Sequence, residues 1–112
     1  MSGTQLPNAQ TAFVADAKVR DYLLDPMHPG NGGKAGFYFS FGFTQARWPR
    51  LRDALRAHPL ANSVAGIRPN PYGRIFTVRC NLVTPDGRDP CITSIWVVDY
   101  SGNRPRLVTA FP

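Results

Sequence analysis

The chain has 112 residues, which is enough for one domain with its own hydrophobic core and too few for two. It carries 13 Lys and Arg against 7 acidic residues, a net charge of +6. No apolar run approaches the roughly 20 residues that span a bilayer, and the polar start has no secretory signal. We therefore expect a protein without membrane contact, either cytoplasmic or delivered as part of a larger secreted carrier.

The basic residues are nearly all arginines, and every acidic residue is an aspartate. Arginine presents a planar fork that suits phosphate, and a positively charged domain attracts polyanions such as RNA. A GC-rich genome would give the same composition without any function. The charge therefore leaves both explanations open.

Residues 1–11 show little periodicity and are predicted to form a flexible tail, followed by a single domain over residues 12–112. Capping residues, prolines and helical spacing of apolar residues predict three short helices, which begin near Asp16, Lys34 and Pro49. A loop dense in glycine and proline, residues 27–33, separates the first two helices.

From Asn62 onward the pattern changes to strands, with apolar and polar residues alternating. The predicted strands are Ser63–Arg68, Arg74–Thr84, Cys91–Tyr100 and Arg106–Phe111. Short turns between them imply an antiparallel meander. The sequence thus predicts an α+β fold, in which two to three N-terminal helices pack on a four-stranded antiparallel sheet.

Two cysteines, Cys80 and Cys91, flank the predicted turn between the second and third strands. They are too few for a metal framework, and the sequence predicts no metal and no cofactor. They are either a disulfide across the hairpin or two small buried hydrophobic residues. The sequence does not decide between these states, nor does it give the oligomeric state.

Two motifs are distinctive: His-Pro followed by Gly-Gly-Lys-Ala over residues 28–35, and Leu-Val-Thr-Ala-Phe-Pro over residues 107–112. Together with Tyr22–Met27, Pro71–Gly73 and Ser94–Trp96, they resemble a family of small bacterial domains of unknown function. Members of that family occur alone and as C-terminal tips of polymorphic and contact-dependent toxins. The resemblance covers nearly the whole chain after Ala12.

This resemblance, with the order of helices and strands, implies a distant similarity to the barnase, colicin and RelE group of RNase toxins. It implies a metal-independent RNase, with tRNA among its substrates, and a small acidic immunity or antitoxin-like partner. The chain has no glutamate, which some of these RNases use as a base. Histidine, lysine, arginine, threonine and tyrosine are left to carry the chemistry.

His28 is the first acid–base candidate, because an imidazole exchanges protons near neutral pH. Lys34 follows two glycines and is a candidate phosphate-binding charge. Each has a structural alternative: His28 as part of a turn between two prolines, and Lys34 as a surface residue at a helix start. The loop does not have the spacing of a nucleotide-binding P-loop.

Four residues of the predicted strands complete the candidate site. Arg74 and Thr109 are proposed with the catalytic group, and Arg79 and Thr93 with the substrate-binding group, on the premise that they share the exposed face of the sheet. Tyr72, in a turn, is the candidate for stacking on a base. Ordinary solvent-facing strand residues are the alternative, and a non-catalytic basic module that binds a protein partner or nucleic acid is the alternative function.

Overall fold

The computed structural model describes residues 4–112, and within them all the helical segments precede the strands. The helical segments are η1 (Ala9–Thr11), α1 (Asp16–Lys18), the π-helical turn η2 (Val19–Leu23), α2 (Lys34–Ser40) and α3 (Trp48–Ala61). The predicted α+β fold is confirmed. In the described part of the chain, no helix is long and apolar enough to cross a membrane.

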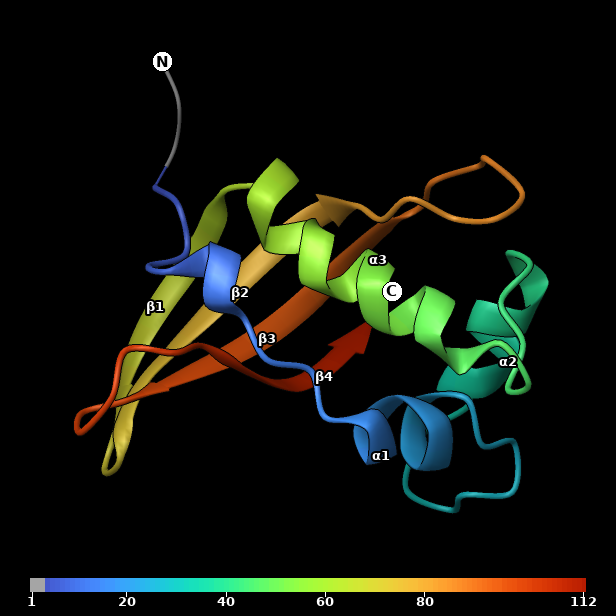
Figure 1. Cartoon of the computed structure of the whole chain (residues 1–112), viewed down its shortest axis with the longest axis horizontal. Helices are drawn as coiled ribbons and strands as arrows, with labels where there is room; N and C mark the ends of the chain where they lie inside the picture. Colours follow the sequence, from blue (N-terminus) through green and yellow to red (C-terminus); the bar gives the residue numbers. More distant parts are fainter. Residues whose placement is uncertain (1–3) are drawn as a thin grey trace.

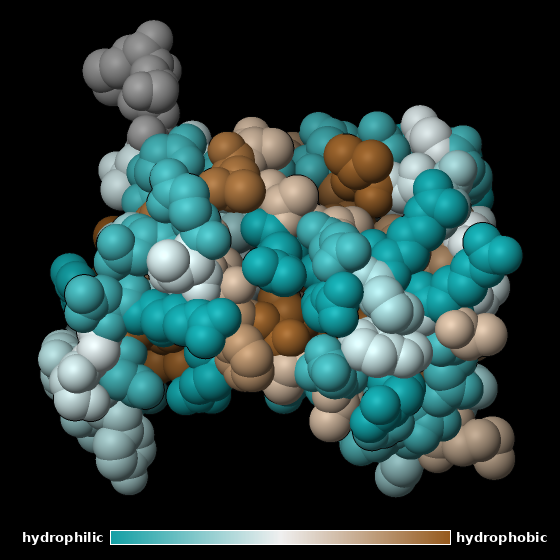
Figure 2. All heavy atoms as spheres, viewed as in Figure 1, coloured by the Kyte–Doolittle hydropathy of each residue, from teal (hydrophilic) through white to brown (hydrophobic). Residues whose placement is uncertain are grey.

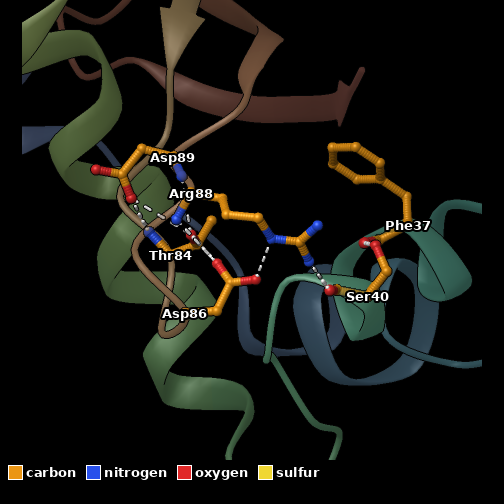
Figure 3. Close-up of polar contacts among 6 residues, drawn as sticks. All are labelled: Phe37, Ser40, Thr84, Asp86, Arg88 and Asp89. Atoms are coloured by element: carbon orange, nitrogen blue, oxygen red, sulfur yellow. Dashed lines mark hydrogen bonds and ion pairs between the residues drawn. The ribbon is translucent and has the colours of Figure 1, made fainter.

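The strands form one antiparallel sheet in the order of the chain, β1-β2-β3-β4. They are β1 (Val64–Asn70), β2 (Gly73–Asn81), β3 (Cys91–Asp99) and β4 (Arg106–Phe111). The second strand ends three residues earlier than predicted. Residues 82–90 form a loop whose polar groups bond to one another, and Figure 3 shows part of this network.

One face of the sheet carries the core. Phe76, Val78 and Trp96 point to this face and are at most 1 % exposed, as the alternation of β2 predicts. The long helix α3 crosses the sheet on this side (Figure 1). Figure 2 shows the outside of this helical layer, where hydrophilic residues cover most of the surface and apolar side chains gather in patches. The opposite face is called the open face below.

A buried histidine joins α3 to the sheet. His58 Nδ1 lies 2.8 Å from the hydroxyl of Ser94 on β3, and its Nε2 lies 2.7 Å from the carbonyl oxygen of Cys80 on β2. The indole N–H of Trp96 donates to the same Ser94 hydroxyl at 2.8 Å. Nε2 must carry a proton to donate to a carbonyl, so a neutral ring accepts from Ser94 at Nδ1.

The His58 network makes stability depend on pH. Burial lowers the pKa of His58 from its ordinary 6.5, so the unfolded chain binds the proton more tightly than the folded one. Stability is therefore fully present above about pH 6.5 and falls below it, by at most about 1.4 kcal/mol per pH unit for one proton. Urea unfolding between pH 8 and pH 5 should show this fall in the wild type and lose it in His58→Gln. Equal slopes in both proteins would contradict this origin.

The segment predicted as a flexible tail differs from expectation where the structure describes it. Leu6 and Ala9 are buried in the core, and the backbone N–H of Val64 donates to the carbonyl of Thr4 at 2.7 Å. Residues 4–11 therefore pack on the domain, because two buried apolar side chains and a hydrogen bond from β1 to Thr4 hold them there. The remainder of the predicted tail, residues 1–3, lies outside the described residues.

Candidate functional site

The loop between η2 and α2 is held in shape by a buried asparagine. Asn31, 3 % exposed, donates its side-chain N–H groups to the carbonyls of Tyr22 and Asp25, at 2.9 and 2.7 Å. Its side-chain oxygen accepts from the N–H of Gly33 at 3.0 Å. Gly32 and Gly33 have φ of 62° and 82°, which glycine adopts without steric cost. The loop rich in glycine and proline, residues 27–33, is thus an ordered element.

This loop brings His28 and Lys34 to one tyrosine. The rings of His28 and Tyr22 meet edge to face with centroids 5.0 Å apart. Lys34 Nζ lies 5.6 Å from the centroid of the Tyr22 ring and 3.5 Å from its hydroxyl. Lys34 also donates to the carbonyl of Asn31 at 3.0 Å. We call Tyr22, His28 and Lys34 the loop cluster.

The imidazole of His28 has one nitrogen engaged by its own loop. The backbone N–H of Gly30 donates to His28 Nδ1 at 3.0 Å. Because Nδ1 is the acceptor, the proton of a neutral ring lies on Nε2. Within residues 4–112, no hydrogen-bond partner is found for Nε2. The arrangement can therefore present a proton donor to a bound group.

Three candidates, which we call the open-face group, lie together on the open face: Arg79, Thr93 and Thr109. Arg79 pairs with Thr93 across β2 and β3, and its Nε donates to the Thr93 hydroxyl at 3.1 Å. Thr109 pairs with Ile95 of β3, and Thr77 pairs with Ile95 from the other side. The Thr109 hydroxyl is buried and has no hydrogen-bond partner in the described structure. Such a group is costly unless something bonds to it.

Arg74 does not share this face. It is five positions from Arg79 on the same strand, and an odd separation places two strand residues on opposite sides. Its guanidinium lies over the ring of Phe76, 5.5 Å from the centroid, on the core side of the sheet. The premise that Arg74 and Arg79 share the exposed face was therefore wrong.

Tyr72 lies in the turn between β1 and β2 and is 77 % exposed. It borders a hollow on the open face of about 640 Å³, lined with Ile75, Val97 and Arg106 among others. The β1–β2 turn and the loop between η2 and α2 lie at opposite ends of the molecule (Figure 1). The structure thus separates Tyr72 and Arg74 from the loop cluster.

The helix that begins at Lys34 docks on the strand that carries Thr109. Tyr38, one helical turn after Lys34, donates its hydroxyl to the carbonyl of Ala110 at 2.7 Å. Burial raises the pKa of Tyr38 far above its ordinary value, so the phenol stays protonated and can donate. Among residues 4–112, however, no hydrogen bond or ion pair joins His28 or Lys34 to the open-face group.

Sequence reasoning missed Tyr22 as part of the candidate site. It belongs to the first predicted helix, which was not expected to contribute to the site, and the structure leaves it partly buried with its hydroxyl toward the loop. The signal was its place beside the His-Pro motif. For metals, the described residues contain no group of three His, Cys, Asp or Glu side chains close enough to hold an ion.

The comparisons with known proteins agree with this architecture. Residues 5–112 match the family described as Domain of unknown function (DUF6883). The chain belongs to the DUF6883 family. No curated protein matches the chain in sequence.

This DUF6883 domain also has a structural relative. A chain of the "Contact-dependent growth inhibition toxin - immunity protein complex from Klebsiella pneumoniae 342" superposes with a TM-score of 0.68 and 18 % sequence identity. The match covers 88 % of the present chain and 97 % of the other. At this identity, the likeness shows the shared fold.

The role of Asn31 in this DUF6883 domain can be tested by an isosteric change. Asn31→Asp removes the N–H donors and turns a carboxylate toward the carbonyls of Tyr22 and Asp25. We expect the free energy of unfolding to fall by about 2 kcal/mol, measured by urea denaturation. Asn70→Asp is the matched control, because Asn70 only accepts a bond, from the N–H of Tyr72. Equal losses in both variants would contradict this role.

Proposed function

We propose that this domain is an RNase-like toxin that cleaves RNA by metal-independent chemistry, with tRNA as its candidate substrate. The observation that carries the proposal is the loop cluster, in which a buried asparagine holds an imidazole and an ammonium group against one tyrosine. A net charge of +6 favours an anionic substrate. The structural relative found in a toxin–immunity complex supports the toxin part of the proposal.

In the proposed reaction, the 2′-hydroxyl of a ribose loses its proton to solvent water and attacks the adjacent phosphate, and the 5′ oxygen leaves with a proton from the protein. His28 acts in its imidazolium form, giving the leaving oxygen the proton on Nε2, the nitrogen that its loop leaves unengaged, and returning to the neutral ring in which Nδ1 accepts from Gly30. Lys34 offsets the negative charge that builds on the phosphate. The reaction class needs a base, an acid and a cation; in this proposal solvent water is the base, and the loop cluster holds the acid and the cation against one tyrosine.

The open-face group has a binding role in this proposal. Arg79, already oriented by its bond to Thr93, contacts a phosphate of the RNA backbone. The Thr109 hydroxyl is buried and without a partner among the described residues, so in this proposal its side chain rotates outward to donate to the same RNA strand. The docking of Tyr38 on Ala110 supports this arrangement, because it brings the helix of Lys34 to the strand of Thr109.

The proposed biological setting follows from charge and from the relative. A small acidic protein would bind this basic domain and neutralise it, as an immunity or antitoxin-like partner does. The domain would act in a cytoplasm, either its own or one that it enters as part of a larger carrier. The excess of arginine in this DUF6883 domain supplies the positive charge on which both RNA binding and neutralisation by an acidic partner depend.

A second candidate function is a non-catalytic module that binds nucleic acid or a protein through its basic surface. It is favoured by the lack of any direct bond between the loop cluster and Arg79 in the described structure. In this case the domain would bind RNA without cutting it, with an affinity that falls steeply as salt rises.

One experiment separates the two functions. Purified domain is incubated with total tRNA in the presence of a metal chelator, and the products are resolved on a denaturing gel. Discrete fragments are the expected result. Intact tRNA that nevertheless shifts in a salt-dependent binding assay would overturn the RNase proposal and support the binding module. Cleavage that stops with chelator would overturn the metal-independent mechanism.

A further inference from the structure

Two thiols approach each other closely at the base of the β2–β3 loop. The sulfur atoms of Cys80 and Cys91 are 2.8 Å apart, with the Cys91 S–H directed at Cys80. Both are free thiols, and both residues are exposed. A disulfide has its sulfurs about 2.05 Å apart, so a small further approach would complete a covalent bond.

The regular geometry of the sheet does not produce this approach. Cys80 pairs with Ile92, and Cys91 pairs with Asn81, so strict alternation would place the two side chains on opposite faces. Cys80 breaks the alternation, since its φ is 141° and its side chain is exposed where those of Phe76 and Val78 are buried. The irregular backbone thus turns the Cys80 side chain from the core face of the sheet to the surface.

The buried histidine holds this irregular residue in place. The carbonyl of Cys80 accepts the hydrogen bond from His58 Nε2 at 2.7 Å, and the neighbouring carbonyl of Asn81 accepts from the side chain of Asn62 at 3.1 Å. A non-glycine residue persists in a sparsely populated conformation only when its surroundings fix it there, and such residues gather at functional sites. In this chain the fixed conformation brings two accessible sulfurs together.

We propose that Cys80 and Cys91 are a redox-active pair that forms a reversible intramolecular disulfide. A low-molecular-weight disulfide, such as oxidised glutathione, is the oxidant. One cysteine thiolate attacks a sulfur of the oxidant and releases one thiol. The second cysteine thiolate then displaces the other thiol and forms the Cys80–Cys91 bond. In total, the protein loses two protons and two electrons, and the oxidant becomes two thiols.

The bond would close the loop that fastens α2 to the sheet. Arg88 of this loop bonds to Asp86 and to the carbonyl of Ser40 in α2 (Figure 3). The N–H of Asp86 donates to the carbonyl of Phe41 at 3.3 Å, and the Arg88 guanidinium lies 4.4 Å from the centroid of the Phe41 ring. A covalent tie at the base of the loop restricts its opening and therefore keeps α2 docked.

The test uses the full chain in glutathione buffers that run from reducing to oxidising, at mildly alkaline pH. The alkalinity matters because the hydrogen bond to Cys80 raises the pKa of the Cys91 thiol, and the thiolate is the reacting form. Samples are alkylated and weighed intact. We expect two alkyl groups on the reduced monomer and none on the oxidised monomer, whose mass should lie about 2 Da below that of the unalkylated reduced chain because two hydrogens are lost. The oxidised form should also show slower amide exchange in residues 82–90.

Cys91→Ser is the control, because it keeps Cys80 and its backbone but cannot form the internal bond. It should bind one glutathione under oxidising conditions and show no change in amide exchange of the loop. Two alkyl groups on the wild type in the most oxidising buffer would overturn the proposal. So would a disulfide that links two chains on a non-reducing gel. Neither result depends on whether the domain cleaves RNA.

Discussion

Replacing Lys34 or His28 by glutamine is expected to slow RNA cleavage about 100-fold, the lower end of what a positioned acid or a transition-state cation contributes. His28→Gln removes the proton donor at Nε2, and Lys34→Gln removes the ammonium charge that contacts the same tyrosine, Tyr22. Single-turnover cleavage of tRNA, with enzyme in excess, measures the chemical step apart from product release.

Arg50→Gln is the matched control for these two variants. Arg50 is an exposed residue of α3, outside the loop cluster and the open-face group, so its loss removes one positive charge without touching the proposed site. It should change the rate by less than about threefold through weaker general attraction. Cleavage that survives both loop-cluster substitutions would place the chemistry elsewhere. An equal loss of cleavage rate in all three variants would show that the effect comes from the change in net charge and not from the proposed site.

Replacing Gly73 by alanine is expected to lower the free energy of unfolding by about 3 kcal/mol, the upper end of the range for overpacking. A Cβ on Gly73 would lie 2.1 Å from the carbonyl oxygen of Val98 and 2.8 Å from Cα of Asp99. Both are backbone atoms of the neighbouring strand, so β2 and β3 must move apart at the residue where β2 begins.

Gly66→Ala is the control for this effect. Gly66 lies on β1, beside Thr77 of β2, and a Cβ there would meet nothing within 4 Å. Its replacement should change stability by less than about 1 kcal/mol, because alanine also restricts the unfolded chain. Urea unfolding of the two variants beside the wild type measures both values. A Gly73→Ala protein as stable as Gly66→Ala would show that β2 and β3 separate at little cost.

The order of the elements could be predicted from local pattern. The alternation of apolar and polar residues predicted the second strand, in which Phe76 and Val78 are buried, and glycine and proline marked the loop at residues 27–33. These signals are local, since they report which backbone conformation suits a few adjacent residues. The same alternation, applied strictly, places Arg74 and Arg79 on opposite faces of the sheet. The prediction that they share a face was therefore a misreading of a pattern that the sequence does contain.

The contacts that make the candidate site are not local. Tyr22 reaches Lys34 through a loop whose closure depends on the side chain of Asn31. Tyr38 reaches Ala110 across 72 positions in the sequence. Periodicity carries no information about which helix docks on which strand, because docking depends on loop geometry and sheet register. The packing of residues 4–11 escaped prediction for the same reason.

By itself, the sequence determined a basic α+β domain, with helices before a four-stranded antiparallel sheet and an imidazole and an ammonium group on one glycine-rich loop. Only the tertiary structure decided what these groups meet. It brought His28 and Lys34 to Tyr22, placed Arg79 beside Thr93 and turned Cys80 toward Cys91. The reason is that side-chain preferences act over a few residues, whereas a site forms where distant segments are forced together by a shared core.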